Sequence, residues 1–437
     1  MTTTKIAFIG AGSVVFTQGL LADLFAFEEL KGGVHIALHD IDAERLATAE
    51  GAARHIAAHL GAAPRITAHA DRGAALDGAA FVINIVQVGM RESTRTDFEI
   101  PARYGVRQTI GDTLGAGGVF RALRTFPLLR SLGEDIAELC PDAWLLNYTN
   151  PMAMNVQYLA QATGLSRVVG LCHSVYWTMR DLSELVDVPY EEVNYHAAGV
   201  NHQAWVLRFE HQGENLYPRL DALVEQDAQL RRRVRIDMYR RLGHYPTETS
   251  EHSSEYVPWY LGHASEVERL RLPVGAYLGI VDDNVAQYEK TREALLAGTP
   301  LDVAGTMEYA PQVVHSIVTG TPRTIYGNVP NRGLIANLPA GGTVEVPCLV
   351  DASGVQPTAV GELPPQCAAL NRTYLSMNDL VVRAALEDDP RHIRHALMTD
   401  PATAAALPVE RIWQLCDDMV RAHRDLLQPG LRAELGS

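Results

Sequence analysis

The chain has 437 residues, of which 47% are hydrophobic and 20% charged, a composition typical of a globular enzyme rather than of a disordered or fibrous protein. Its formal net charge of −15 argues against nucleic acid and anionic membrane surfaces as partners. Five scattered cysteines, no signal region and no apolar run of transmembrane length together predict a cytoplasmic protein with reduced thiols.

The first element in chain order is a short apolar strand pattern at residues 5–9, followed by a glycine turn. Gly10, Gly12 and Ser13 lie between this strand and a helical pattern, an arrangement that directs the N-terminal amides of a helix at a diphosphate. The spacing departs from G-x-G-x-x-G, because Val15 stands where the third glycine is expected. These three residues are therefore candidates for dinucleotide binding that need support from the next strand.

That support comes from a second strand pattern, Val34–Asp40, which ends in an acidic residue. Asp40 is placed to accept hydrogen bonds from a ribose, and its charge would repel a 2′-phosphate, so NAD is favoured over NADP. The alternative is that Asp40 and Asp42 only cap the helix expected over Ala43–Leu60. We assign the ribose to Asp40 and the cap to Asp42.

The strand patterns that follow have apolar residues that do not alternate with polar ones, which is typical of a parallel sheet covered on both faces. They lie at Arg65–Ala68, Phe81–Gly89, Ala143–Asn147 and Val168–Cys172. The βα rhythm weakens near residue 190. We therefore predict an α/β protein with a Rossmann-type NAD-binding domain over residues 1–190, and an α+β domain over residues 191–437 for substrate, metal and oligomer contacts.

A polar, glycine-rich stretch from Met90 to Gly118 follows one of these strands. We expect it to form a loop that covers the site and leads into a helix over Val119–Leu132. Arg91, Asp112 and Thr113 in this loop are candidates for contacts with hydroxyl groups of substrate or cofactor. Ordinary loop polarity is the alternative for all three.

Polar side chains at successive strand ends are the most informative feature of the chain. Asn150 follows one strand and precedes a proline, Cys172 and His173 follow the next, and His202 lies in the strand-like segment Tyr195–Glu210. Taken singly, a buried cysteine or histidine is most often only a packed core residue. Together, downstream of a nucleotide-binding start, these residues predict a metal and substrate site.

The remaining sequence predicts helices around a β region that is punctuated by glycine and proline, Thr324–Val360. The segment His244–Tyr260 is dense in Glu, His, Ser and Tyr and is a second candidate for function. An arginine-rich helix over Leu220–Leu242 is interpreted as a solvated or intersubunit face. Further helical patterns lie at Asp282–Leu296, Gln312–Thr319, Asn378–Glu387, Pro390–Met398 and Val409–Leu427.

Read in order, the motifs of the chain resemble glycoside hydrolase family 4, the NAD- and metal-dependent glycosidases, over nearly its whole length. The motifs are GAGS, DID, NYTNPMAMN, GLCHSV, GVNH, TETSEHSSEYVPW and YGNV with NLPAGGTVEVPCLVD. The string Cys172–Val175 is similar to the α-galactosidase (melibiase) branch, since phospho-glycosidase branches typically have Asp or Asn where this chain has His173. The fold is expected to be like that of lactate and malate dehydrogenases.

The resemblance implies an α-galactosidase that acts on melibiose-type substrates with NAD and Mn²⁺ as cofactors. The implied reaction is oxidation at C3, deprotonation at C2, elimination, addition of water and re-reduction, which differs from the two-carboxylate mechanism. Cys172 and His202 are expected to bind the metal, which polarises O2 and O3. Asn150 is expected to bind the same hydroxyl edge. A homodimer or homotetramer is also implied.

Two catalytic roles follow from this scheme. His173, next to a metal ligand, is placed to protonate the leaving oxygen. Tyr256 is the first choice for the base that removes the C2 proton, with His252 and Glu251 as alternatives. The sugar stays open, since α-glucosides and α-uronides are possible, the latter with Arg91 as carboxylate partner. A net NAD-dependent dehydrogenase and a non-catalytic NAD- or sugar-binding module are the other function classes.

Overall fold

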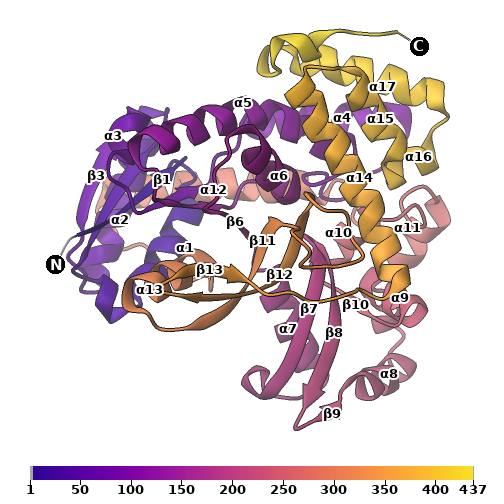
Figure 1. Ribbon diagram of the computed structural model, residues 1–437, viewed down its shortest axis with the longest axis horizontal. Coiled ribbons are helices and arrows are strands. Elements are labelled where there is room, and N and C mark those ends of the chain that lie inside the picture. Colours follow the sequence, from indigo (N-terminus) through magenta and orange to yellow (C-terminus); the bar gives the residue numbers. More distant parts are fainter. Residues whose placement is uncertain (1–2, 437) are drawn as a thin grey trace.

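The first half of the chain forms a parallel β-sheet in a computed structural model that describes residues 3–436 (Figure 1). Its strands are β1 (Thr4–Ile9), β2 (Val34–His39), β3 (Arg65–His69), β4 (Phe81–Asn84), β5 (Trp144–Asn147) and β6 (Val168–Leu171). They run parallel in the order β3-β2-β1-β4-β5-β6. This is the Rossmann order, in which ligands bind at the carboxyl edge where the order reverses, between β1 and β4. The predicted Rossmann-type sheet is confirmed.

The sheet continues without a break into the second half of the chain. The added strands are β7 (Val193–Val200), β8 (Gln203–His211), β9 (Glu214–Asn215), β10 (Tyr245–Pro246), β11 (Arg323–Pro330), β12 (Thr343–Asp351) and β13 (Gly354–Pro357). β11 pairs antiparallel with β6, and β12, β7, β8 and β10 follow in antiparallel order. The predicted boundary near residue 190 lies between strands of this one sheet, and the division into two domains stays a prediction.

Helices cover both faces of the parallel strands, as a buried Rossmann sheet requires. In Figure 1, α5 (Gly115–Leu139) and α6 (Met152–Ala162) lie above the strands, and α1 (Val14–Phe25) and α13 (Tyr309–Thr319) lie below. The other helices are α2 (Ala43–His59), α3 (Arg72–Leu76), α4 (Met90–Tyr104), α7 (Ser174–Leu185), α8 (Tyr217–Gln226), α9 (Val234–Leu242), α10 (Ser250–Glu255), α11 (Ala264–Leu270), α12 (Ala276–Ala297), α14 (Pro365–Glu387), α15 (Arg391–Thr399), α16 (Pro401–Ala406) and α17 (Val409–His423). Short 3₁₀ turns lie at Glu28–Leu30, Tyr190–Glu192, Leu230–Arg232, Arg424–Leu426 and Pro429–Arg432.

The polar stretch that was expected to be a loop is instead the helix α4, followed by a shorter loop. The sequence of α4 is polar, but Asp97 and Phe98 face inward, and the helix packs against α5 and α17. This tertiary packing overrides the weak local signal. The loop after α4 lies very close to α5 at Gly118. A Cβ on this glycine would lie only 2.4 Å from the backbone carbonyl carbon of Thr113, so the close approach requires glycine.

The single strand-like segment expected over Tyr195–Glu210 is a hairpin of two strands, β7 and β8. His202 lies in its turn with a φ of 62°, in the left-handed region that a non-glycine residue rarely adopts. Three smaller differences concern element ends. β4 stops at Asn84, the helix expected over Leu220–Leu242 is interrupted between α8 and α9, and α14 begins well before Asn378.

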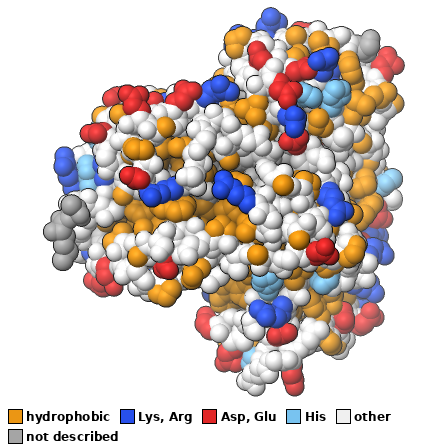
Figure 2. All heavy atoms as spheres, in the orientation of Figure 1, with side chains coloured by type: hydrophobic (Ala, Val, Ile, Leu, Met, Phe, Trp, Pro, Cys, Tyr) orange, Lys and Arg blue, Asp and Glu red, His pale blue; other side chains and the backbone are white. Residues whose placement is uncertain are grey.

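Charged side chains of both signs are interspersed over the face shown in Figure 2, with hydrophobic side chains gathered in a band between α5 and β13. Among the described residues, no helix combines the length and the apolar character needed to cross a membrane.

A buried ion pair ties α4 to α5 and the C-terminal helix α17. The Arg124 guanidinium donates two hydrogen bonds to the Asp97 carboxylate, at 3.0 and 2.7 Å, and their side chains are 0% and 2% exposed. His423 Nε2 lies 2.9 Å from the same carboxylate, but out of line for a hydrogen bond. Removing one partner of such a pair leaves an uncompensated buried charge.

Asp97→Ala should therefore destabilise the protein by about 3–5 kcal/mol, because Arg124 would remain buried without its counter-charge. Glu99→Ala is the matched control on the same helix. Glu99 pairs with Arg95 at the surface, with side chains 52% and 55% exposed, so its loss should cost less than about 1 kcal/mol. Urea denaturation of the two variants measures the difference, and equal midpoints would contradict this role of the buried pair.

Candidate active site

The turn between β1 and α1 has the geometry of a dinucleotide site. Gly10 has a φ of 87°, and a Cβ there would lie 2.8 Å from the Val86 side chain. Gly12 donates its N–H to Asp40 Oδ2 at 2.7 Å, and a Cβ on Gly12 would lie 2.5 Å from that oxygen. Ser13 precedes α1 without a side-chain cap, which leaves the amides of the helix N-terminus directed at the carboxyl edge.

The two acidic residues after β2 have different partners. Asp40 is half-buried and accepts from the N–H groups of Gly12 and Asp42. Asp42 accepts from the N–H groups of Glu44 and Arg45, which confirms it as the cap of α2. The ribose role of Asp40 stays a prediction. Its carboxylate lies beside the glycine turn, which is the position that this role requires.

Three ligand atoms converge where β6 ends beside the β7–β8 turn. Cys172 Sγ lies 3.4 Å from His202 Nε2, and Glu248 Oε2 lies 4.0 Å from each of these two atoms. Ligands bound about 2.1–2.4 Å from one tetrahedral cation are separated by roughly 3.4–3.9 Å. The three distances are at or within about 0.1 Å of this range, and the three residues form a group that could hold a metal ion.

The hydrogen bonds of Thr113 define the tautomer of His202. The Thr113 hydroxyl donates its one hydrogen to Asp112 Oδ1 at 2.7 Å. It can then only accept from His202 Nδ1, which lies 3.1 Å away. Nδ1 therefore carries the proton, and the lone pair of Nε2 faces Cys172 and Glu248. This is the support that metal-binding histidines commonly receive from the residues behind them.

The backbone of Glu248 is held in an unusual conformation. Its φ is 69°, and its N–H donates to Thr178 Oγ1 at 2.9 Å. Strained non-glycine residues of this kind cluster at functional sites, where the surrounding structure holds them in place. Here the conformation directs the Glu248 carboxylate at Cys172 and His202.

Burial sets the charge of the two predicted metal ligands. It lowers the pKa of His202 to about 4, with His252 adding to the effect, so the imidazole is neutral at pH 7. Burial also raises the pKa of the Cys172 thiol well above its usual value, and the charges of Glu248 and Glu345 raise it further. Without a cation the sulfur is therefore a thiol, and a bound cation would favour the thiolate.

His173 stands beside Cys172 at the start of α7, paired with a buried glutamate. Its Nδ1 lies 2.5 Å from Glu308 Oε1, and the side chains of His173 and Glu308 are 40% and 2% exposed. Burial lowers the pKa of His173, but the hydrogen bond and the charge of Glu308 outweigh it, so the pKa is raised. This pairing favours an imidazolium that can give up a proton from its other nitrogen.

The loop before α5 brings two predicted substrate residues together. Asp112 Oδ2 accepts from Asn150 Nδ2 at 2.8 Å. The loop is held from below by Glu255, whose Oε1 accepts the N–H groups of residues 109–111 at 2.7, 3.0 and 2.9 Å. Burial raises the pKa of Glu255 to about 7 in spite of these bonds. Asp112 is thereby positioned between Asn150 and Thr113.

Tyr256, the first choice for the base, is committed elsewhere. Its hydroxyl donates to the carbonyl oxygen of Asn201 at 2.7 Å, and its ring lies 4.9 Å from that of Tyr374. Burial raises the pKa of Tyr256 well above the usual value. A hydroxyl that is so hard to ionise and already donates to the backbone is a poor base, so the geometry does not support this prediction.

Arg91 and Glu251 are also not brought to the cluster. Arg91 is exposed on α4, where its Nε pairs with Asp282 at 2.6 Å. Glu251 contacts the loop through its backbone oxygen, which accepts from Thr109. His252 is different, since its ring lies 4.1 Å from that of His202. It is 7% exposed, and its Nδ1 has no hydrogen-bond partner among the described residues.

Three acidic residues of the site were missed by sequence reasoning: Glu248, Glu308 and Glu345. Glu248 and Cys172 are 76 residues apart in sequence, so no local pattern connects them. Glu345 is fully buried on β12, accepts from Ser174 Oγ at 3.5 Å, and has its pKa raised to about 8 by burial. A charge inside the apolar strand pattern TVEVP was the signal that could have found it.

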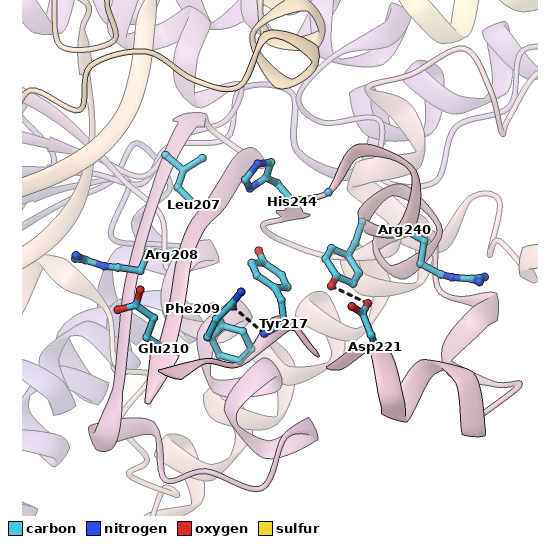
Figure 3. Close-up of a pocket in the computed structure, with 11 residues that line it drawn as sticks. Leu207, Arg208, Phe209, Glu210, Tyr217, Asp221, Arg240 and His244 are labelled. Atoms are coloured by element: carbon cyan, nitrogen blue, oxygen red, sulfur yellow. Dashed lines mark hydrogen bonds between the residues drawn. The ribbon is translucent and has the colours of Figure 1, made fainter. Parts of the chain in front are cut away.

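A separate hollow of about 530 Å³ lies between β8, α8 and α9 and shares no residue with this cluster (Figure 3). Its aromatic hydroxyls serve the fold. Tyr217 donates to the carbonyl oxygen of Val206 at 2.6 Å, and Tyr239 donates to Asp221 at 2.8 Å. The candidate catalytic residues are not among the residues that line this hollow.

Comparison with known proteins gives two family matches and several relatives. The family 4 glycosyl hydrolase model matches residues 5–188, and the model of the family 4 glycosyl hydrolase C-terminal domain matches residues 197–403. An alpha-galactosidase of Bacillus subtilis (strain 168) is 38% identical over 97% of this chain and 99% of its own. An alpha-galactosidase of Rhizobium meliloti (strain 1021) is 34% identical, and the match covers 97% of this chain and 89% of the relative. A more distant relative is an alpha-galacturonidase of Thermoanaerobacterium saccharolyticum (strain DSM 8691 / JW/SL-YS485), 27% identical over 92% of each chain.

Solved structures agree on the fold. A 6-phospho-alpha-glucosidase from gut microorganisms, in complex with NAD and Mn²⁺, has a TM-score of 0.83 at 20% identity over 98% of this chain and 99% of its own. A malate dehydrogenase of Cryptosporidium parvum has a TM-score of 0.54 at 15% identity. The match covers 88% of this chain and 100% of the malate dehydrogenase chain. The expected likeness to malate dehydrogenase is thus confirmed for the fold.

The electrostatics of Cys172 can be tested by alkylation of the metal-free protein. Glu248→Gln removes one of the carboxylates that raise the pKa of the thiol, so the thiolate fraction at pH 8 should increase, by roughly tenfold per unit of pKa. Iodoacetamide labelling, read by mass spectrometry, should therefore be faster in this variant. The other four cysteines are buried and Cys172 is half-buried, so the label reports mainly on Cys172.

Glu251→Gln is the control for this experiment, because that neighbouring glutamate is not among the charges that raise the thiol pKa. Equal labelling rates in the wild type and the Glu248→Gln variant would contradict the inferred coupling between the carboxylate and the thiol.

Proposed function

Because the chain belongs to glycosyl hydrolase family 4, we propose that it is an α-galactosidase that requires NAD and a divalent cation such as Mn²⁺. The observation that carries this proposal is the convergence of Cys172, His202 and Glu248 beside a dinucleotide-type glycine turn. The identity of 38% and 34% to two proteins named alpha-galactosidase supports the galactoside over other sugars.

The residues present fit NAD. Gly10 and Gly12 keep the turn before α1 narrow, since a side chain at either would clash, and the N-terminal amides of α1 can receive a diphosphate. Asp40 would bind the ribose hydroxyls, giving up its bond from the Gly12 N–H or sharing it. NAD supplies a hydride acceptor and donor for C3 of the sugar, so no net redox change results.

The donor set also fits a divalent cation. Cys172, neutral His202 and Glu248 would hold it, and substrate oxygens or water would complete the shell. The carboxylate and the sugar oxygens are hard ligands that suit Mn²⁺, whereas the thiolate and imidazole alone would suit Zn²⁺. Such a cation would supply Lewis acidity, which makes a proton next to a sugar carbonyl group easier to remove.

The side chains of this chain then have defined tasks. Asn150, oriented by Asp112, would bind the hydroxyl edge of the sugar. His173, charged through its pairing with Glu308, would protonate the leaving glycosidic oxygen as the C1–O bond breaks. The glycosidic oxygen, now protonated, leaves as the hydroxyl group of the released alcohol. Water then adds at C1, and the base delivers to C2 a proton that has exchanged with solvent.

We assign the base to His252, in place of Tyr256. His252 is one of the alternatives that the sequence offers for this role. Its ring lies beside His202 and near Asp112. Its buried Nδ1 has no hydrogen-bond partner among the described residues. A buried, unpartnered nitrogen of this kind is explained by a group that binds there. Glu248 then remains a metal ligand rather than a proton acceptor.

The other function classes receive less support. A uronidase would need a cation for the substrate carboxylate, but Arg91, the predicted partner, is exposed and bound to Asp282. A net dehydrogenase needs no cysteine and histidine pair of ligands, and a binding module needs no His173–Glu308 pair beside them. An α-glucosidase differs from the proposed enzyme only in how it contacts the C4 hydroxyl.

Stripping either cofactor should abolish the activity. Protein freed of NAD, or treated with chelator, should not hydrolyse an α-galactoside, and adding NAD with Mn²⁺ should restore hydrolysis without accumulation of NADH. In D₂O, the released galactose should contain deuterium at C2, because the proton removed there exchanges with solvent. Full-rate hydrolysis by the stripped protein, or galactose without C2 deuterium, would refute the elimination mechanism.

Three variants separate the base from the metal ligands. His252→Asn should lower kcat by about 10²–10⁴-fold and suppress C2 exchange, with Mn²⁺ affinity retained. Glu248→Gln should weaken Mn²⁺ binding, and Tyr256→Phe, the control, should keep kcat within about threefold of wild type although it loses a buried hydrogen bond. If Glu248→Gln abolishes exchange with Mn²⁺ still bound, the base is Glu248 and not His252.

A further inference from the structure

Solvent reaches the site from the side of His173. The side chain of His173 is 40% exposed, whereas those of His202, Glu248 and Glu308 are only 4%, 16% and 2% exposed. Exposure thus falls steeply from His173 toward the metal ligands. A substrate that places its C2 and C3 hydroxyls at the buried ligands must therefore extend past His173 on the way out.

Trp177 is the next large side chain along this outward path. It lies one turn after His173 on α7, with its N–H donated to the carbonyl oxygen of His173 at 3.0 Å. Residues four apart share one face of a helix. The rings of His173 and Trp177 are nearly perpendicular, with centroids 6.4 Å apart. The ring of Tyr176 also packs against Trp177, with centroids 5.1 Å apart.

The exposure of Trp177 calls for an explanation. This side chain is 43% exposed, and Met307, next to the partner of His173 in the chain, is 48% exposed. An exposed tryptophan thus lies against His173, which is more exposed than His202, Glu248 and Glu308. A partly exposed indole that is held by a neighbouring aromatic ring offers a preformed surface for a flat, partly apolar ligand.

We propose that Trp177 forms the subsite for the leaving group, on which a second sugar ring stacks while His173 protonates the oxygen that links it to the galactosyl unit. A pyranose presents a face of C–H groups that packs on an aromatic ring, and its hydroxyls stay in water. The subsite therefore selects glycosides with a sugar as leaving group over those with a small alkyl group. This inference rests on the proposed glycosidase function.

The geometry also explains why the platform belongs to the leaving group rather than to the galactosyl ring. The galactosyl ring must lie with its C2–C3 edge at Cys172 and His202, on the buried side of His173. The glycosidic oxygen then lies at His173. What remains of the substrate beyond that oxygen can only be the leaving group, on the side where Trp177 lies.

The test compares two α-galactosides whose leaving groups are alkoxides of similar basicity: methyl α-galactoside, and galactose α-linked to O6 of glucose. In the holoenzyme, Trp177→Ala should lower kcat/KM for the disaccharide roughly three- to tenfold, the range expected for one lost aromatic contact. The methyl glycoside should change less than about twofold on the same grounds. Trp177→Phe should recover most of the disaccharide rate.

Trp259→Ala is the matched control, since that tryptophan is 38% exposed and lies in a different groove, with Pro258 and Leu370. It should change neither rate. Equal losses on both substrates in Trp177→Ala, or no loss on either, would overturn the subsite. So would a changed oligomeric state of the variant in size-exclusion chromatography, which would make Trp177 a subunit contact.

Failure of the proposed function would look different. If wild-type holoenzyme cleaves neither galactoside, the α-galactosidase proposal fails and the subsite fails with it. If the wild type cleaves both and the ratio of their kcat/KM values does not respond to Trp177, only the subsite fails. Should Trp177→Ala reduce the soluble yield, Trp177→Leu keeps a larger apolar side chain than alanine, removes the aromatic face and must give the same shift in the ratio.

Discussion

The crowding of buried acidic groups around one thiol is the constraint on which the site depends. Glu248, Glu308 and Glu345 surround Cys172 closely enough that all three raise the pKa of its thiol in addition to burial. Like charges in a low-dielectric interior repel strongly. Part of this repulsion is relieved by protonation, since burial raises the pKa of Glu345 to about 8. The imidazolium of His173 offsets part of the remaining charge, and a bound cation would offset more.

The sheet makes this crowding possible. Cys172 follows β6, Glu345 lies on β12, and His202 lies in the turn between β7 and β8, so each polar group is held by a different strand. Hydrogen bonds to backbone and hydroxyl groups position the acidic groups further, as for Glu255 below the loop. The folding free energy of the strands therefore outweighs the local electrostatic cost.

Much of this arrangement can be predicted from the sequence, because strand ends are local features. Asn150, Cys172 and Asp40 were identified as residues that follow apolar strands, and parallel strands bring such residues to one edge. The helix α4 could not be predicted in this way, because its buried face becomes evident only when α5 and α17 pack on it. Tyr256 is a plausible base by residue type alone, and only the structure shows its burial and its bond to the Asn201 carbonyl, which make it a poor one.

The unbroken sheet has a consequence for how substrate enters. β11 bonds to β6 on one side and β12 on the other, so backbone hydrogen bonds join the strands that follow the glycine turn to those that carry Glu345 and His202. Rotation of the two halves about a hinge would break these bonds. We therefore expect admission of a glycoside to depend on short-range movements at the rim, of single side chains and connecting segments, rather than on rotation of the two halves.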